Sequence, residues 1–473
     1  MANIHLKRID CRQADAVDQL TQLRNQLSSH DDVISEKGRQ LTEAVFGEAL
    51  PPSRVVEKVC KDVQSRGLEA LLHYTEQFDK VQLDSRTFRV SQEELQSAYQ
   101  KADPAFLDTI RNVKQNVLSF QSGLLHADAS LQVEGLHELR VRYRPMKRVG
   151  VCIPGGAAAY PSTLLMTVCP ARAAGVKQIA AVLPPTPFGG YNQDLLATCF
   201  ELGVDEVYRI GGAQAVAALA YGVEGLAPVD MIVGPGNLFV TLAKKFVFGQ
   251  VNIDCLAGPS EIIVIADDTA PAEFVASDLI AQAEHDPGTS ILITWHEPLL
   301  DQVSAALEKQ LERLDRSEQT RHCLQTFGAL VLARDSDEAV QLTNQLGPEH
   351  LHIATRNAMD MADRIDNAGA VFVGNYSPVA LGDYAAGPSH VLPTGGTARF
   401  ASGLSSNDFL RRSSLLTFSR NGMLAMARDV EILATKEGLT GHAASVEIRA
   451  NVPEAVPTPT NGSAKGLTSG VDS

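Results

Sequence analysis

The sequence predicts an α/β protein built on parallel sheets, and two series of short apolar runs carry that prediction. The first series begins at Arg148 and contains "RVGVCIPGG", "QIAAVLPP", "EVYRIGGAQA" and "MIVGPGN". The second contains "EIIVIAD", "SILITW", "ALVLARD", "HLHIATR" and "AVFVGNY". Because strand-length runs alternate with helical segments, the strands of each series should lie parallel, with binding loops at their carboxyl ends.

The flanking segments complete the expected organisation. The first fifty residues look like amphipathic helix and connector, and "RVVEKVCKDVQSRGLEALLHYTEQF" has apolar residues at helical spacing. "ATKEGLTGHAASVEIRAN" predicts a closing helical segment, followed by a Pro/Ser/Thr/Gly-rich tail. We therefore expect two Rossmann-like parallel-sheet domains with helical N-terminal and C-terminal segments. The expected boundaries are 1–47 for the N-terminal helical segment, 48–150 plus 260–404 for the main α/β domain, 151–259 for the second α/β domain, 405–450 for the C-terminal helical segment and 451–473 for a disordered tail.

The composition excludes several classes of protein. The chain has 473 residues, 44% hydrophobic and 21% charged, which is typical of a folded globular protein. Its net charge of -15 disfavours a nucleic-acid partner. The seven cysteines include no CxxC pair, and the opening "MANIHLKRIDCRQADAV" has no signal-peptide core, so a reducing cytoplasm is expected. The uncharged stretch 149–171 is interrupted by glycine and proline, which argues against a membrane span.

The stretch "DLIAQAEHDPG" places a glutamine and a histidine three positions apart at the end of a predicted helix. Gln282 and His285 then share one helical face, and the "DPG" that follows should end the helix. The pair suits a metal, although a histidine at a helix end often interacts only with the last carbonyl groups. The long Gly/Pro-rich loop after "AVFVGNY" carries Asp383 and His390, and His442 lies in the closing segment. A site of Gln282, His285, Asp383 and His442 would have only nitrogen and oxygen ligands, which suits zinc and tolerates manganese or cobalt.

A second candidate pair is Glu349 and His350 in "GPEHLHIA", at the junction of a loop and a predicted strand. Both side chains can face one cavity there, although a turn with solvated charges has the same pattern. His390 could join that cavity or make a structural hydrogen bond, and Glu437 is by itself indistinguishable from a surface carboxylate. Neither a GxGxxG nor a GxxxxGK[ST] motif is present, so the residues alone reveal no nucleotide cofactor.

Five motifs in this order resemble the histidinol dehydrogenase family: "LAGPSEIIVIADDTA", "DLIAQAEHDP", "GPEHLHI", "GDYAAGPSHVLPTGGTARF" and "KEGLTGHAASVEIR". The resemblance runs from about residue 40 to residue 450. It implies a zinc-dependent homodimer that oxidises L-histidinol to L-histidine through L-histidinal with two NAD, the last step of histidine biosynthesis. It also implies that 151–259 binds NAD and that 405–450 mediates dimerisation, with the C-terminal segment of one chain completing the metal site of the other.

The resemblance further assigns roles to individual residues. It implies that Glu349 and His350 are the acid/base pair, and that one zinc per chain is held by Gln282, His285, Asp383 and His442. The substrate site would comprise Ser260, Gln282, His285, His350, Asp383, His390, Glu437 and His442. The NAD contacts would be Cys152, Gln214 and Asn237. Cys152 departs from the tyrosine that many members have there, which puts the cofactor contact at this position in doubt.

Oxidation of an alcohol to an acid needs two hydride transfers with a hydration between them. A neutral His350 can take the alcohol proton, and an ionised Glu349 is suited to deprotonating the water that adds to the aldehyde. The metal can hold the imidazole and amine of the substrate and so orient the reacting carbon. Oxidation of another amino alcohol, a metal-dependent hydrolase and a non-catalytic relative are the alternative interpretations.

Overall fold

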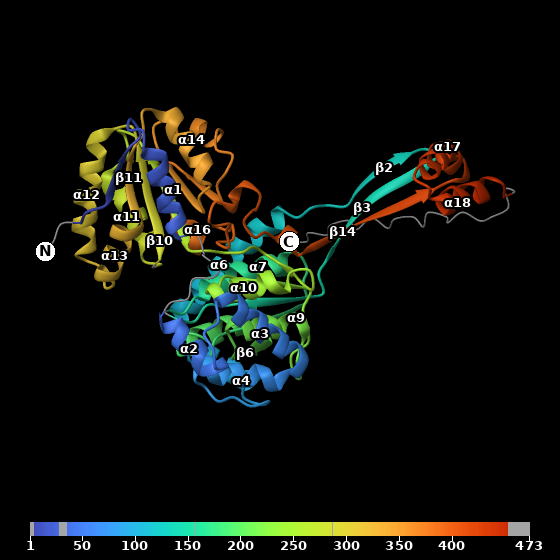
Figure 1. The fold of residues 1–473 in the computed structure, drawn as a ribbon, viewed down its shortest axis with the longest axis horizontal. Coiled ribbons are helices and arrows are strands. Elements are labelled where there is room, and N and C mark those ends of the chain that lie inside the picture. Colours follow the sequence, from blue (N-terminus) through green and yellow to red (C-terminus); the bar gives the residue numbers. More distant parts are fainter. Residues whose placement is uncertain (1–3, 28–35, 157, 286, 453–473) are drawn as a thin grey trace. The chain divides into compact units, whose positions relative to one another are not determined.

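The computed structural model describes residues 4–27, 36–156, 158–285 and 287–452. The chain divides into two compact units (Figure 1). The large unit comprises Met1–Leu125 and Pro145–Leu410, and the small unit comprises His126–Arg144 and Arg411–Ser473. The expected tail lies outside the described residues from 453 onwards.

The large unit contains a six-stranded sheet in which every pair of neighbouring strands is parallel. Side chains alternate across it: in β9, Ile262 and Val264 contribute to one core, whereas Ile263 and Ile265 contribute to the other. The strands in spatial order are β1 (Lys7–Asp10), β11 (Gly328–Leu332), β10 (Gly288–Thr294), β9 (Ser260–Ala266), β12 (His350–Ala354) and β13 (Ala370–Val373). The helices that carry its core residues are α1 (Ala16–Leu27), α11 (Ala272–Ala283), α12 (Glu297–Leu311), α13 (Ser317–Phe327), α14 (Ser336–Leu346), α15 (Ala358–Ala362) and α16 (Val379–Tyr384).

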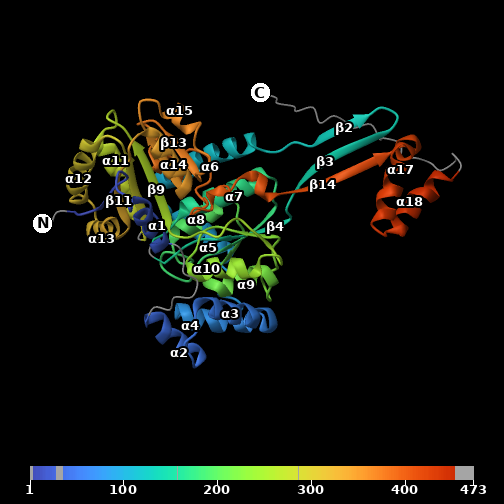
Figure 2. The same cartoon turned by 45° about the horizontal axis from the view of Figure 1, so that its top comes forward.

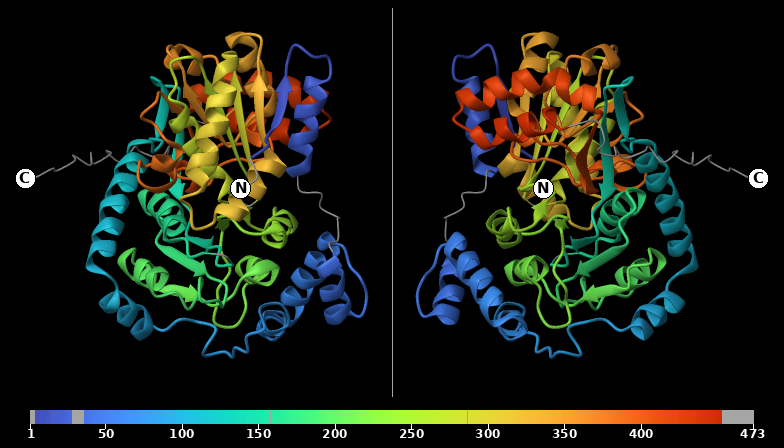
Figure 3. Two further views of the ribbon diagram at one scale, coloured as in Figure 1. Left: turned by 90° about the vertical axis from the view of Figure 1, so that its left-hand side faces the viewer. Right: turned by 90° about the vertical axis from the view of Figure 1, so that its right-hand side faces the viewer.

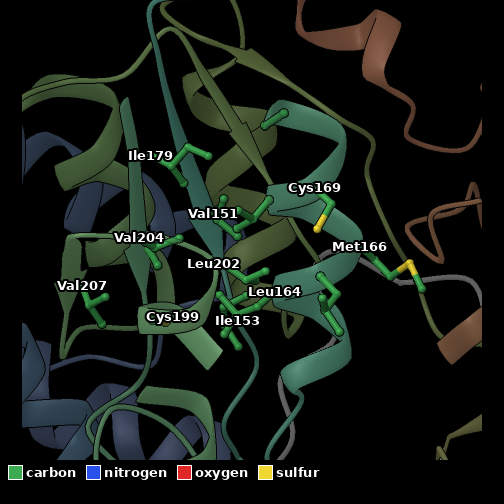
Figure 4. Close-up of a cluster of buried hydrophobic side chains, with 14 of the residues drawn as sticks. Val151, Ile153, Leu164, Met166, Cys169, Ile179, Cys199, Leu202, Val204 and Val207 are labelled. Atoms are coloured by element: carbon green, nitrogen blue, oxygen red, sulfur yellow. The ribbon is translucent and has the colours of Figure 1, made fainter. Parts of the chain in front are cut away.

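The large unit also contains a five-stranded parallel sheet, seen below the first sheet in Figure 3. Its order is β6 (Glu206–Tyr208), β5 (Gln178–Val182), β4 (Arg148–Cys152), β7 (Met231–Val233) and β8 (Asn252–Ile253). One core contains residues of α5 (Gln92–Lys101), α6 (Pro104–Gly123), α7 (Pro161–Ala173) and α8 (Gln193–Glu201), and Figure 4 shows Val151 and Leu164 within it. The other contains residues of α3 (Pro52–Arg66), α4 (Leu68–Asp79), α9 (Gly212–Tyr221) and α10 (Leu238–Val247).

These two sheets confirm the predicted α/β class, but the structure divides the chain differently from the expected boundaries. The helices of 48–150 were assigned to the main domain, yet α3 and α4 pack with α9 and α10 (Figure 2). Helical spacing identifies the apolar face of a helix but does not identify the sheet that covers it. The segment 1–47 contains α1 and α2 (Glu36–Phe46) as expected, and it also supplies β1, whose Ile9 is buried in the six-stranded sheet.

The small unit joins two segments that are far apart in the sequence. Its sheet has the order β14 (Leu410–Phe418), β3 (His137–Pro145) and β2 (Ala129–Val133), and β2 and β3 are antiparallel. The helices α17 (Arg420–Lys436) and α18 (Thr440–Ala450) pack against each other. The expected C-terminal helical segment therefore contains both helices, together with a strand that sequence analysis missed. No helix among the described residues has both the length and the apolar character needed to cross a membrane.

Candidate active site

The candidate acid/base residues lie at the amino ends of β9 and β12. Ser260 is the first residue of β9, His350 is the first residue of β12, and Glu349 directly precedes it. This position contradicts the expectation that binding loops of this sheet lie at its carboxyl ends. The register explains the cluster, because His350 pairs with Ile262 and therefore brings the starts of the two strands side by side.

Glu349 is a buried carboxylate with two hydrogen-bond donors. The hydroxyl of Ser260 and the backbone N–H of Glu261 both donate to its Oε2, the latter at 3.0 Å. Burial raises the pKa of Glu349, although His350 and the bond from Ser260 act in the opposite direction. These two donors therefore favour the ionised form in a place where burial disfavours it.

His350 is held in one tautomer. Its Nδ1–H donates to the carbonyl oxygen of Glu261 at 3.1 Å, which leaves Nε2 as the nitrogen that can accept a proton. Nε2 lies 3.3 Å from Oδ1 of Asp383, an ion-pair distance, and yet it is buried without a hydrogen bond among the described residues. Burial lowers the pKa of His350, but the carboxylates of Glu349 and Asp383 outweigh this effect and raise it to about 9.

Asp383 and His390 extend the cluster toward the other sheet. Asp383 lies in α16 (Val379–Tyr384), and His390 Nδ1 donates to its carbonyl oxygen at 2.9 Å. His390 Nε2 is 3.4 Å from the hydroxyl of Thr163, in the first turn of α7, so that hydroxyl can donate to it. Burial raises the pKa of Asp383, but the contact with His350 lowers it overall, whereas burial lowers the pKa of His390. The amino edge of the six-stranded sheet therefore meets a helix that follows β4 of the five-stranded sheet.

Gln282 and His285 lie at the end of α11, as the sequence predicts. Gln282 occupies its last turn and is 3% exposed, and His285 follows the helix with its N–H bonded to the carbonyl of Gln282. Asp286 lies outside the described residues. His285 interacts electrostatically with Asp383, and Nε2 of Gln282 is buried without a hydrogen-bond partner among the described residues. Three of the four predicted ligands thus belong to the large unit, and two of them, His285 and Asp383, interact.

The donor set of these three residues fits a zinc ion. An imidazole, a carboxylate and an amide are nitrogen and oxygen donors, and the unpartnered amide of Gln282 can turn its oxygen toward an ion. The fourth predicted ligand, His442, is exposed in α18 of the small unit, and Glu437 is exposed just after α17. No group of three or more His, Cys, Asp or Glu side chains in the described part of the chain forms a metal site.

A cavity of about 630 Å³ adjoins this cluster. Asp383 and His390 form part of its lining, and Phe120, Leu124 and Leu381 supply much of the apolar remainder. The latter three side chains are each at least 40% exposed, so the cavity opens onto an apolar surface. An apolar surface beside polar catalytic groups is typical of a ligand site or an interface.

The predicted NAD contacts lie at the carboxyl ends of the five-stranded sheet, as expected for that domain. Cys152 ends β4, Gln214 lies in the first turn of α9, and Asn237 caps α10 by accepting from the N–H of Val240 at 3.2 Å. Gly234 approaches β4 so closely that a Cβ there would lie 2.2 Å from the carbonyl oxygen of Cys152. The Cys152 side chain is 5% exposed and packs in the core, where burial raises its pKa to about 12, so it offers little surface to a cofactor.

A buried contact between a histidine and an aspartate joins α11 to β12, and the sequence analysis did not identify it. Nδ1 of His352 is 2.6 Å from Oδ2 of Asp278, and its Nε2 donates to the carbonyl of Gly374 at 3.0 Å. Asp278 precedes Gln282 by one helical turn, and His352 lies two residues after His350. The sequence did contain a signal for this contact, because Asp278 lies on the apolar face of "DLIAQA". A charge buried there requires a partner. No pattern in the sequence pointed to Thr163.

Comparison with known proteins identifies the family of this chain. The family model described as histidinol dehydrogenase matches residues 50–450. The chain is 56% identical over 447 residues to a histidinol dehydrogenase of Rhodopirellula baltica, covering 94% of this chain and 97% of the relative. It is 45% identical over 398 residues to one of Bacillus cereus, covering 84% and 92%. A crystal structure of histidinol dehydrogenase from Elizabethkingia anophelis matches with a TM-score of 0.84 at 32% identity, over 95% of this chain and 99% of that one. The chain belongs to the histidinol dehydrogenase family.

Proposed function

We propose that this protein oxidises L-histidinol to L-histidine through L-histidinal, with two NAD as hydride acceptors. The observation that carries the proposal is the buried cluster of Glu349, His350 and Asp383, in a chain of the histidinol dehydrogenase family. The cluster supplies two different proton acceptors in one place. The reaction requires both, because a proton leaves the alcohol and another leaves the water that adds to the aldehyde.

His350 takes the alcohol proton at Nε2. Its Nδ1–H is committed to the carbonyl of Glu261, so only Nε2 is free to react. The neighbouring carboxylates raise the pKa of His350 to about 9, so near neutral pH only its neutral fraction can take the alcohol proton. When Asp383 is engaged as a metal ligand, less of its charge acts on His350, and the neutral form becomes more populated near neutral pH.

Glu349 takes the proton of the hydrating water. The hydroxyl of Ser260 and the backbone N–H of Glu261 donate to its carboxylate and favour the ionised form. Nδ1 of His350 lies 3.6 Å from its Oε2. Ser260 also supplies a hydroxyl to the substrate site that it lines. Since both bases occupy one buried site, the aldehyde can be oxidised without being released.

Zinc is the metal that fits the donor set, and Gln282, His285 and Asp383 would hold it together with His442 from a second copy of the chain. The bound ion supplies a Lewis-acidic anchor for the imidazole and amine of the substrate. His390 supports this arrangement because it holds the carbonyl of Asp383 at one end and contacts Thr163 at the other. Protein stripped of metal by a chelator should lose activity and regain it when zinc is added.

A homodimer with shared active sites is supported by the surface of the small unit. In α17, the buried residues are Gly422, Ala427 and Ala434, all of them small. Large apolar side chains of this unit are instead exposed, an arrangement that typically marks an interface. They are Leu131, Val133, Leu416, Met426, Val430, Ile432, Leu433, Leu439, Ile448 and Val452. Glu437 and His442 lie on this exposed unit and can therefore serve the site of a partner.

The test is NADH formation by the zinc-loaded protein with L-histidinol. We expect two NADH for each L-histidinol consumed and L-histidine as the product. A single NADH per substrate with release of the aldehyde, or no NADH at all, would refute the proposed function. A panel of other amino alcohols tests the substrate, because the account predicts the highest kcat/KM for L-histidinol.

A further inference from the structure

The carboxylate of Asp79 lies beside the predicted cofactor contact Gln214. Asp79 is the last residue of α4, and its Oδ2 accepts from Nε2 of Gln214 at 3.2 Å. Gln214 is 2% exposed, and Gly212 makes room for its other end, since a Cβ at Gly212 would lie 2.7 Å from Oε1. The amide of Gln214 is thus confined between the end of α4 and the start of α9.

Asp79 has no cationic partner among the described residues to balance its charge. Burial is the cause that raises its pKa to about 6, and the side chain is still mostly ionised at neutral pH. An ionised carboxylate offers about four lone-pair positions, and Gln214 occupies one of them. Because a partly buried charge with unfilled acceptor positions costs stability, this arrangement suggests a ligand that donates hydrogen bonds.

The position of Asp79 indicates which kind of ligand would donate a hydrogen bond to its carboxylate. Gln214 lies in the first turn of α9, which follows β6 at the carboxyl edge of the five-stranded sheet. Dinucleotides bind at such edges, with their pyrophosphate attracted by a helix N-terminus. In a dinucleotide the groups next to the pyrophosphate are the two riboses, whose hydroxyls are good donors to a carboxylate.

We propose that Asp79 accepts a hydrogen bond from a ribose hydroxyl of the dinucleotide cofactor, alongside Gln214. This inference rests on the proposed use of NAD and adds a cofactor-binding residue to it. The carboxylate has two tasks: one lone pair fixes the amide of Gln214, and another receives the ribose. The hydroxyl keeps its proton, so no proton transfer is involved.

The experiment compares NADH binding by the zinc-loaded protein and two variants, with NADH fluorescence as the readout. Asp79→Asn retains an acceptor for Gln214 but removes the charge, and we expect it to weaken NADH binding about tenfold. Glu69→Gln is the matched control, because Glu69 lies on the same helix in an exposed pair with Arg66, and its NADH affinity should not change.

Four NADH analogues, each lacking one ribose hydroxyl, separate direct contact from an indirect effect. For one of them, the wild type and Asp79→Asn should bind with equal affinity, because the hydroxyl that Asp79 recognises is already missing. If Asp79→Asn bound NADH and all four analogues more weakly than the wild type by the same factor, the inference would be overturned. Unchanged NADH binding by Asp79→Asn would also overturn it. Failure of the proposed function is distinguishable, since the wild-type protein itself would then neither bind NADH nor oxidise L-histidinol.

Discussion

His350 and Glu349 are neighbours in the chain, but their surroundings give them different chemistry. One nitrogen of His350 is committed to a backbone carbonyl, so the other is its reactive atom. Glu349 is surrounded by donors that favour its charged form. We therefore propose that the two residues act as separate bases for separate protons, and this difference can be measured.

Glu349→Gln should impair the oxidation of L-histidinal more than that of L-histidinol, because a neutral amide cannot deprotonate water. We expect about a hundredfold loss in kcat with the aldehyde and less than about tenfold with the alcohol. His350→Ala should slow both steps. Separate assays with the two substrates check this, and equal losses for Glu349→Gln would refute the assignment of its role.

Ser260→Ala should move the acid limb of the pH profile of L-histidinal oxidation to higher pH. The Ser260 hydroxyl stabilises ionised Glu349 and lowers its pKa, so its removal raises that pKa further. Activity that needs the ionised form is then lost at a higher pH, by about one pH unit. Ser277→Ala is the control, because that hydroxyl donates to the carbonyl of Phe274 on the exposed side of α11. A shift to lower pH, or none, would contradict this account.

At the scale of elements, the site depends on how α11, β9 and β12 are held together. The strands are joined by backbone register, whereas α11 is tied to β12 by the buried pair of Asp278 and His352. This pair lies one helical turn from Gln282 and two residues from His350. It therefore fixes the distance between α11, which carries Gln282, and β12, which begins at His350.

Asp278→Asn should lower stability substantially, because Nδ1 of His352 then loses the carboxylate that it faces in a buried place. We expect a loss of about 3 kcal/mol in the free energy of unfolding, seen as a lower melting temperature. The control Asp268→Asn removes an exposed pair with Arg356 and should cost less than about 1 kcal/mol. If both variants melted at the same temperature, the contact of Asp278 with His352 would not hold α11 against β12.

The strands of both parallel sheets could be predicted largely from the sequence, because their apolar runs are local signals. β1 was missed because four residues are too short to show a period, and β2 and β3 because they are half exposed or exposed along their whole length. The partner sheet of α3 and α4 could not be predicted, since packing between distant segments leaves no local pattern. The place of Glu349 and His350 at the start of a strand could be predicted, but the approach of α16 and α7 to that strand end could not, for the same reason.

At the residue level, the motifs "QAEH" and "GPEH" and the loop with Asp383 identified groups that the structure brings together. Sequence reasoning could not find the Nδ1–H bond of His350 or the contact of Thr163 with His390, because both depend on three-dimensional position. Cys152 was expected to contact the cofactor, and its burial in the core weakens that expectation.

At the scale of the whole molecule, the central claim is that two chains complete each active site. The large unit supplies Gln282, His285 and Asp383, while His442 belongs to a small unit with an exposed apolar surface. In a twofold dimer, each small unit can then serve the site of the other chain. Two inactive variants with lesions on opposite sides of the interface should therefore complement each other.

The most direct measurement mixes His350→Ala and His442→Ala, unfolds both together and refolds them with zinc. Each variant alone should be nearly inactive. Random pairing makes half of the dimers mixed, and each mixed dimer has one intact site of two, so activity should recover to roughly a quarter of that of wild type treated alike. If His442 serves its own chain, no pairing produces an intact site. No recovery in the mixture, with full recovery of the wild type, would contradict the shared active site.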